Sequence, residues 1–269
     1  RYNMPAVALT DHGALYGALE FYKKCTAAGV KPIIGIEAYV APRRRFDKEP
    51  VIDGRAAHLT LLAKNETGYK NLIKLTTKAH LEGYYYRPRV DKELLREHRD
   101  GLVCLSGCFG SELMGALRTN RHDRAEQIAR EYQSIFGREN YFLETMHHPR
   151  LEGHDAANKR VVALGERLGI PLVATYDSHY PNADDNIAHD TLVAIQTRTD
   201  VKNPNRLSNL QEDFSFIDPQ AAAERYRYAP GAVENTIRVA EMCDINLQLG
   251  NWVFPNFEIP AGSSYDEEL

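Results

Sequence analysis

The strongest constraint on the fold is a repeating order of short apolar runs and amphipathic stretches. The apolar runs lie at residues 6–9, 32–40, 59–63, 102–105, 141–144 and 172–175. Helical patterns lie at residues 13–28, 67–79, 111–118, 122–136, 155–168 and 183–196. Short buried strands that alternate with helices indicate βα units around a parallel sheet. Because these units lack a glycine-rich dinucleotide turn, we predict a closed or distorted barrel rather than an open doubly wound sheet.

The domain organisation is predicted from the point where this alternation of strands and helices ends. The pattern weakens after residue 200, where prolines become frequent and a helical stretch lies around 231–243. The stretch 254–262 contains two prolines and reads as extended chain. We therefore predict a barrel core over residues 1–200, an appended or barrel-closing segment over 201–250, and a linker over 251–269 that leads towards a further domain.

Composition places the chain among soluble globular proteins, with 43% hydrophobic and 26% charged residues. The net charge of −4 gives no overall electrostatic case for nucleic-acid binding, which depends on clustered Lys and Arg. Local basic groups occur at Arg43, Arg44 and Arg45 and at Arg87 and Arg89. On their own, such groups are more typical of solvated loops than of DNA contacts.

The four cysteines form no CxxC pair and suggest neither a disulfide framework nor a zinc knuckle. A reducing, cytoplasmic environment fits this pattern best. No apolar run approaches the ~20 residues that a membrane helix needs, so we expect no membrane association.

Side chains that can bind metals gather directly after the ends of four predicted strands. They are Asp11, His12, Cys108, Glu144, His147, His148, Asp177 and His179. In a βα barrel these strand ends open into one mouth, where active sites are built. Imidazole and carboxylate mixtures suit Zn²⁺, Mn²⁺ or Fe, and a thiol favours zinc. The sequence therefore predicts a metal site at the mouth of the barrel.

Each of these residues also has a simpler interpretation. Asp11 could stabilise a turn or cap the helix that follows it. A lone Cys108 is usually a small buried apolar residue. Glu37 lies within an otherwise apolar strand and needs a partner, for which a cation is the economical choice. His58 precedes its strand rather than following it, so its position alone suggests a structural role.

Several motifs carry a resemblance to a known family. They are ALTDHGALYGALEFYKKC, GVKPIIGIEAYVAP, HLTLLAKNETGYKNLIKLTTKAHLEGYYYRPRVDKELL, GLVCLSGCFGSEL and VATYDSHY. In this order, over nearly the whole chain, they resemble the PHP domain (polymerase and histidinol phosphatase) of bacterial DNA polymerase III alpha subunits. The stretch from GAVENTIRVAEMCDINLQLG to VFPNFEIPAG resembles the family's passage towards the polymerase palm.

The resemblance implies a distorted (βα)7 barrel that carries up to three divalent metal ions in its mouth. The implied ligands are His12, Glu37, His58, Cys108, Asp177 and His179. Asp11 would orient a ligand rather than bind the metal itself. The resemblance thus promotes His58 to a ligand and prefers Cys108 over Cys104, and it assigns no ligand role to His147 or His148.

The family opens with a strand that carries a His-x-His motif, and this sequence begins beyond that motif. We therefore expect the first barrel strand, with two or three ligands, to be missing from the chain. The barrel would then have an open edge. The polymerase palm would lie beyond residue 269, so the chain alone would not polymerise DNA.

The implied function is a metal-dependent phosphodiesterase that acts as a 3′–5′ proofreading exonuclease within a replicative DNA polymerase. Its partners would be the DNA primer terminus and other polymerase III holoenzyme subunits. One alternative is a non-catalytic scaffold that stabilises the polymerase and docks a separate proofreading exonuclease. Another is a free-standing phosphoesterase such as histidinol phosphatase, which the polymerase-like tail disfavours.

Overall fold

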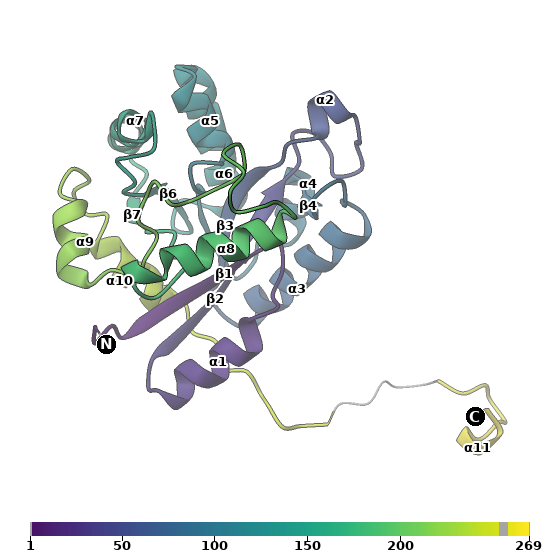
Figure 1. Cartoon of the computed structure of the whole chain (residues 1–269). Coiled ribbons are helices and arrows are strands. Elements are labelled where there is room, and N and C mark those ends of the chain that lie inside the picture. Colours follow the sequence, from purple (N-terminus) through teal and green to yellow (C-terminus); the bar gives the residue numbers. More distant parts are fainter. Residues whose placement is uncertain (1, 253–257, 269) are drawn as a thin grey trace.

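The computed structural model describes residues 2–252 and 258–268. It is a mixed α/β fold in which a sheet curls into a half barrel with helices packed outside it (Figure 1). The strands are β1 (Ala6–His12), β2 (Lys31–Val40), β3 (Ala57–Ala63), β4 (Arg89–Val90), β5 (Leu102–Leu105), β6 (Tyr141–Thr145) and β7 (Leu172–Ala174). Their order is β1-β2-β3-β5-β6-β7, with β4 paired to β2. The predicted distorted βα barrel class is confirmed.

The helices follow the strands much as the sequence pattern indicates. They are α1 (Ala18–Ala27), α2 (Pro50–Asp53), α3 (Glu66–Leu81), α4 (Lys92–Glu97), α5 (Glu112–Arg118), α6 (His122–Phe136), α7 (His154–Leu168), η1 (Ala183–Asp185), α8 (Asn186–Gln196), α9 (Pro219–Arg225), α10 (Glu234–Met242) and α11 (Tyr265–Glu268). Side chains of Asn65, Asp91 and Ser111 cap the first turns of α3, α4 and α5. None of the described helices is long and apolar enough to cross a membrane.

The first helix begins later than predicted. The pattern suggested a start near Gly13, but α1 begins at Ala18 because residues 13–17 form a turn. The carboxylate of Asp11 accepts a hydrogen bond from the Gly17 amide at 2.8 Å, just before the helix starts. Asp11 therefore stabilises the turn that follows β1, one of the two simpler roles expected for it.

The expectation of a parallel sheet is wrong at β3. This strand runs antiparallel to both neighbours, β2 and β5, whereas the pairs β1–β2, β5–β6 and β6–β7 are parallel. The start of β3 consequently lies at the same rim as the ends of its neighbours. His58, the second residue of β3, pairs with Tyr39 near the end of β2. His58 therefore lies at the mouth of the barrel even though it is near the start of its strand.

Most residues of β2, β3, β5, β6 and β7 are buried, as expected for strands that read as near-continuous apolar runs, whereas every residue of β1 is partly or largely exposed. A large cluster between the sheet and the outer helices includes Ile34, Ile36 and Leu61. A smaller cluster inside the curl includes Leu62 and Val173. Helix α10 contributes to this inner cluster, so it closes one side of the interior.

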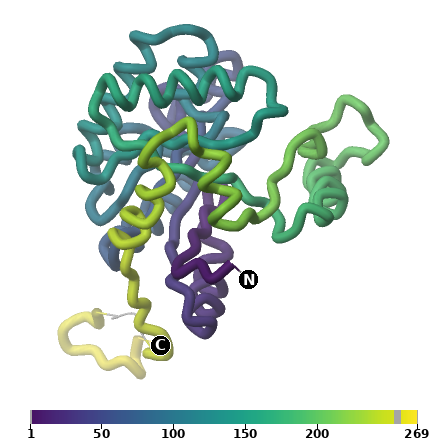
Figure 2. Tube along the Cα trace, turned by 90° about the vertical axis from the view of Figure 1, so that its left-hand side faces the viewer, coloured from purple at the N-terminus to yellow at the C-terminus, as the bar shows by residue number. Residues whose placement is uncertain are grey.

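The later part of the chain has two components. The segment that carries α8 lies apart from the main body (Figure 2). Its two ends are paired, because the His179 amide donates to Phe214 O at 2.8 Å and the Phe216 amide donates to Tyr180 O at 3.0 Å. Helix α10 matches the helical stretch predicted around 231–243. Of the predicted extended stretch 254–262, residues 254–257 lie outside the described residues.

Candidate metal centre

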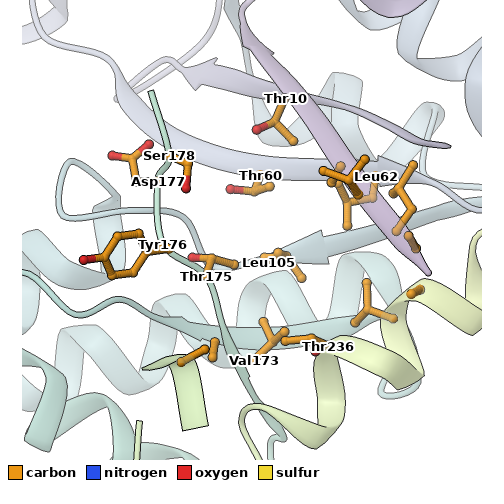
Figure 3. A pocket seen from close by; sticks show the side chains of 18 of the residues that line it. Thr10, Thr60, Leu62, Leu105, Val173, Thr175, Tyr176, Asp177, Ser178 and Thr236 are labelled. Carbon is orange, nitrogen blue, oxygen red and sulfur yellow. The ribbon is translucent and has the colours of Figure 1, made fainter. Parts of the chain in front are cut away.

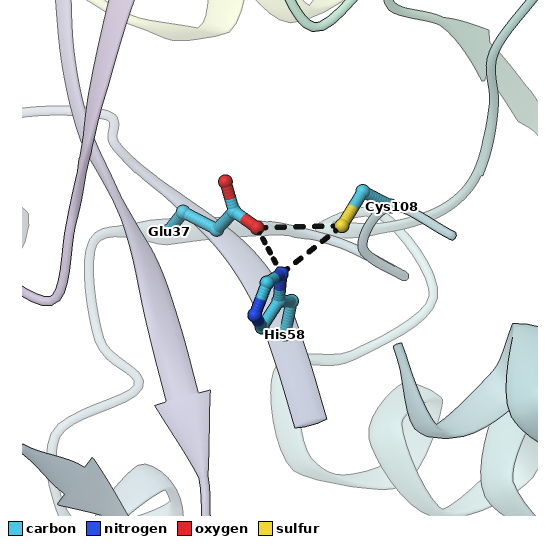
Figure 4. Close-up of side chains that lie close together, drawn as sticks. All are labelled: Glu37, His58 and Cys108. Atoms are coloured by element: carbon cyan, nitrogen blue, oxygen red, sulfur yellow. Dashed lines mark hydrogen bonds and ion pairs between the residues drawn. The ribbon is translucent and has the colours of Figure 1, made fainter. Parts of the chain in front are cut away.

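Three side chains that can bind a metal meet at the rim of the half barrel (Figure 4). His58 Nδ1 lies 3.1 Å from Cys108 Sγ, and Cys108 Sγ lies 3.3 Å from Glu37 Oε1. His58 Nδ1 also forms an ion pair with Glu37 Oε1. The Glu37 residue is only 8% exposed, so this carboxylate is largely removed from water. One carboxylate oxygen, one imidazole nitrogen and one thiol thus converge on a single point.

Strand register brings these residues together. Glu37 of β2 pairs with His12 of β1 on one side and with Thr60 of β3 on the other. Paired residues point to the same face of a sheet, so all three side chains belong to one surface. His58 lies two residues before Thr60, on the same face, and therefore reaches the same space.

The loop after β5 brings in Cys108. Gly107 has a φ of +88°, and a Cβ on it would lie 2.4 Å from His58 O, so this position requires glycine. The His58 amide donates to Gly110 O at 3.2 Å, which ties the loop to the start of β3. Close packing of this loop against β3 therefore fixes the Cys108 thiol beside the imidazole.

The other predicted ligands adjoin this cluster. His12 Nδ1 lies 3.4 Å from Glu37 Oε2, the carboxylate oxygen that faces away from His58. The His12 ring centroid lies 6.1 Å from that of His58 and 6.4 Å from that of His179. His179 Nδ1 lies 3.8 Å from Asp177 Oδ1. His12 thus lies between the cluster and the pair that follows β7.

Burial and charge shift the acid–base properties of the site. Burial would raise the pKa of Glu37, but hydrogen bonding and charge from His58, with the charge of His12, hold it below its ordinary value. Burial raises the pKa of the Cys108 thiol well above its ordinary value, and Glu37 and Asp177 add to the rise. Burial also raises the pKa of Asp177, although His179 opposes this.

Glu144 lies beneath the site, inside the barrel. It is 3% exposed, and its carboxylate accepts hydrogen bonds from Thr60 Oγ1 at 3.0 Å, Thr175 Oγ1 at 2.6 Å and the Gly107 amide at 3.0 Å. Burial raises the pKa of Glu144 to about 7. These bonds link β3 to the segments that carry Cys108 and Asp177, so Glu144 holds the segments that carry these candidate ligands in place.

A cavity of about 1030 Å³ extends from the site along β1, β7 and α10 (Figure 3). Its walls are polar near Thr60, Thr175 and Asp177 and apolar near Leu62 and Val173. A cavity of this size can take a ligand as large as a nucleotide.

Two histidines that received no ligand role occupy different surroundings. His147 packs against Tyr226 and Tyr228, with ring centroids 6.2 and 6.4 Å away. His148 is 2% exposed, its ring lies 4.6 Å from that of Phe214, and neither ring nitrogen has a hydrogen-bond partner among the described residues. Burial lowers the pKa of His148 to about 3 and that of His154 to about 4.

Acid should therefore destabilise the fold through His148. Because its folded pKa is depressed, its stabilising contribution is complete above the unfolded pKa of ~6.5 and is lost as the pH falls towards 3. Between pH 7 and pH 5, His148→Phe should reduce the loss of unfolding free energy by about 2 kcal/mol. Urea unfolding at both pH values measures this, with the exposed His122→Gln as the control. An unchanged loss in His148→Phe would contradict the account.

Comparison with known proteins defines the class of this domain. Residues 1–148 match the family described as PHP domain, and this is more than half of the 269 residues. The chain therefore belongs to the PHP domain family, as its motifs suggested. Asp177 and His179 lie beyond the matched residues.

Individual relatives extend the similarity to nearly the whole chain. The chain is 44% identical over 263 residues to the DNA polymerase III subunit alpha of Treponema pallidum, which covers 97% of this chain and 22% of the relative. It is 43% identical over 273 residues to the DNA polymerase III subunit alpha of Thermus aquaticus. This match covers 98% of this chain and 22% of the relative. The chain thus spans about a fifth of the length of these relatives.

Two features of the site were not predicted from the sequence. The ring of Tyr39 forms a wall of the site, 5.2 Å from the His58 ring and 6.2 Å from the His12 ring. Its pairing with His58 depends on the antiparallel register of β3, which periodicity does not reveal. The sequence places Glu144 at a strand end, but its bonds to Thr60 and Thr175 connect segments far apart in the sequence.

Proposed function

We propose that this site binds divalent metal ions and hydrolyses phosphodiesters. The observation that carries the proposal is the convergence of Glu37 Oε1, His58 Nδ1 and Cys108 Sγ. Buried charged groups need partners, and a cation among a carboxylate, a thiol and an imidazole supplies one. This donor set suits zinc, while the neighbouring histidines and carboxylates also suit manganese or iron.

The residues present fit more than one ion. Glu37 directs Oε1 to His58 and Oε2 to His12, so each of its carboxylate oxygens would be available to a metal ion. His58 and Cys108 would hold one ion together with Glu37. His12, Asp177 and His179 would hold a second ion. A cation would also oppose the effect of burial on the Cys108 pKa and favour the thiolate, which is the form that binds metal. Up to three ions would fit the family pattern.

When bound, such ions activate a water molecule and neutralise charge on the scissile phosphate. The chain's own residues hold this arrangement in place. Asp11 fixes the turn after His12, and Glu144 fixes the segments that lead to Cys108 and Asp177.

We further propose that the domain works within a DNA polymerase III alpha subunit in the cytoplasm, where it removes nucleotides from the 3′ end of a primer. The identities of 43–44% to such subunits support this setting. The partners would be the DNA primer terminus and other subunits of the polymerase III holoenzyme.

The test is digestion of a 5′-fluorescent oligodeoxythymidylate with added Mn²⁺ or Zn²⁺. We expect stepwise shortening from the 3′ end that stops when a chelator is added. His12→Ala should slow digestion by at least about a hundredfold because it loses a metal ligand, whereas His122→Ala, at an exposed position on α6, should not. Bound metal without any digestion would overturn the proposal in favour of a scaffold with a structural metal.

A further inference from the structure

Of the five arginines in the two basic groups, four are held by internal partners. Arg43 pairs with Asp53, Arg44 with Asp47, and Arg45 with Asp91, while Arg89 donates to backbone carbonyls. Arg87 differs, because its exposed guanidinium forms no hydrogen bond or ion pair with any described residue. Its guanidinium carbon lies 5.7 Å from the centre of the Tyr39 ring. Arg87 therefore retains its full capacity to bind an anion.

Arg87 is held close to the candidate metal centre. It lies over Tyr39, the ring that contacts both His58 and His12. The turn after β1 packs against the same loop, because a Cβ on Gly13 would lie 2.9 Å from Pro88 Cγ and 3.0 Å from Tyr39 Cδ2. The guanidinium of Arg87 thus lies at the rim, beside the candidate ligands, on a loop that packs against the turn after β1.

The neighbouring Tyr86 is presented by a tight, anchored turn. The Tyr85 amide donates to Arg87 O at 3.0 Å, and Tyr86 has a φ of +60°, a left-handed conformation that is uncommon for a bulky residue. The buried Arg89 holds the base of the turn through Gly83 O at 3.0 Å. Tyr86 nevertheless remains 65% exposed. A strained backbone that presents an exposed aromatic ring beside a free arginine is typical of a binding surface.

We propose that Arg87 and Tyr86 bind the end of a single-stranded DNA segment as it enters the candidate metal centre. Arg87 contacts a backbone phosphate through charge-assisted hydrogen bonds, and Tyr86 stacks on a base. Stacking and phosphate contacts together are the usual means of binding single strands without sequence preference. This proposal takes its substrate class from the proposed function, but its test does not depend on hydrolysis.

The test measures binding of a fluorescent oligodeoxythymidylate with phosphorothioate linkages, which resist cleavage, by anisotropy over a range of salt concentrations. Arg87→Ala should weaken binding roughly tenfold and lower the slope of log affinity against log salt by about 0.7, because one phosphate contact is lost. Tyr86→Ala should weaken binding by a similar factor without changing this slope. Arg87→Lys should keep the slope and recover part of the affinity.

Matched controls separate local from general effects. Arg138→Ala removes another exposed arginine, and Tyr84→Ala removes another exposed tyrosine of the same loop. Neither should change binding. If Arg87→Ala leaves both affinity and salt slope unchanged, the inference is overturned even where the wild type digests DNA. If the wild type digests nothing but Arg87→Ala shows the predicted losses, the inference stands and the proposed hydrolysis fails.

Discussion

Replacing Cys108 by alanine should lower the affinity for zinc by roughly two orders of magnitude or more, since each ligand of a zinc site contributes several kcal/mol. The thiol lies 3.1 Å from His58 Nδ1 and 3.3 Å from Glu37 Oε1, so its loss removes one of three converging donors. Competition with a chromophoric chelator measures the affinity directly. Zinc at a hundred times its dissociation constant should also raise the wild-type unfolding free energy by about 2.7 kcal/mol, and Cys108→Ala should lose most of this gain.

Cys104→Ala is the matched control. Cys104 is fully buried on β5, four residues before Cys108, and its thiol donates a hydrogen bond to the Leu105 carbonyl at 3.7 Å. Its replacement should cost about 1 kcal/mol of stability through lost packing, with the zinc affinity unchanged. Equal zinc affinities in Cys108→Ala and the wild type would contradict the assignment of Cys108 as a ligand.

Replacing Arg89 by alanine should destabilise the fold by about 3–5 kcal/mol. The Arg89 side chain is fully buried and donates to four carbonyls, Gly83 O at 3.0 Å, Asp53 O at 3.1 Å, Arg45 O at 3.0 Å and Asp47 O at 2.8 Å. Its removal leaves these acceptors without a donor and opens a cavity beside β4. Urea unfolding measures the loss.

The neighbouring Arg87 provides the comparison. Arg87→Ala removes an exposed side chain with no internal hydrogen bond among the described residues, so it should change the unfolding free energy by less than about 0.5 kcal/mol. Two arginines of the same short segment should thus differ several-fold in their effect on stability. A cost below about 1 kcal/mol for Arg89→Ala would show that water satisfies the four carbonyls equally well.

The class of fold could be predicted from the sequence, because apolar runs and helical periodicity are local signals. All six predicted strands occur in the structure, as part of the seven-stranded sheet. The direction of β3 was missed, although a signal existed. Residues 41–56 contain only the four-residue helix α2, whereas a crossover between parallel strands usually carries a full helix. A return in the antiparallel direction was therefore the better expectation for β3.

The candidate site was predictable only in part. Residues that directly follow parallel strands, such as His12 and Asp177, could be assigned to the mouth from position alone. His58 could not, because its place at the rim depends on the direction of β3. Whether Arg87 has an internal partner depends on which carboxylates Arg43, Arg44 and Arg45 bind in the folded chain. Strand direction and side-chain pairing depend on the tertiary structure, and neither produces a periodic pattern in the sequence.

The central claim is that Glu37, His58 and Cys108 hold a metal ion, and anomalous diffraction tests it most directly. Crystals grown with Zn²⁺ would be measured on both sides of the zinc absorption edge. The account predicts an anomalous peak about 2.3 Å from Cys108 Sγ and about 2.0–2.1 Å from a ring nitrogen of His58, with a Glu37 oxygen as a further ligand. Crystals grown with saturating Zn²⁺ that show no anomalous peak among these three side chains would contradict it.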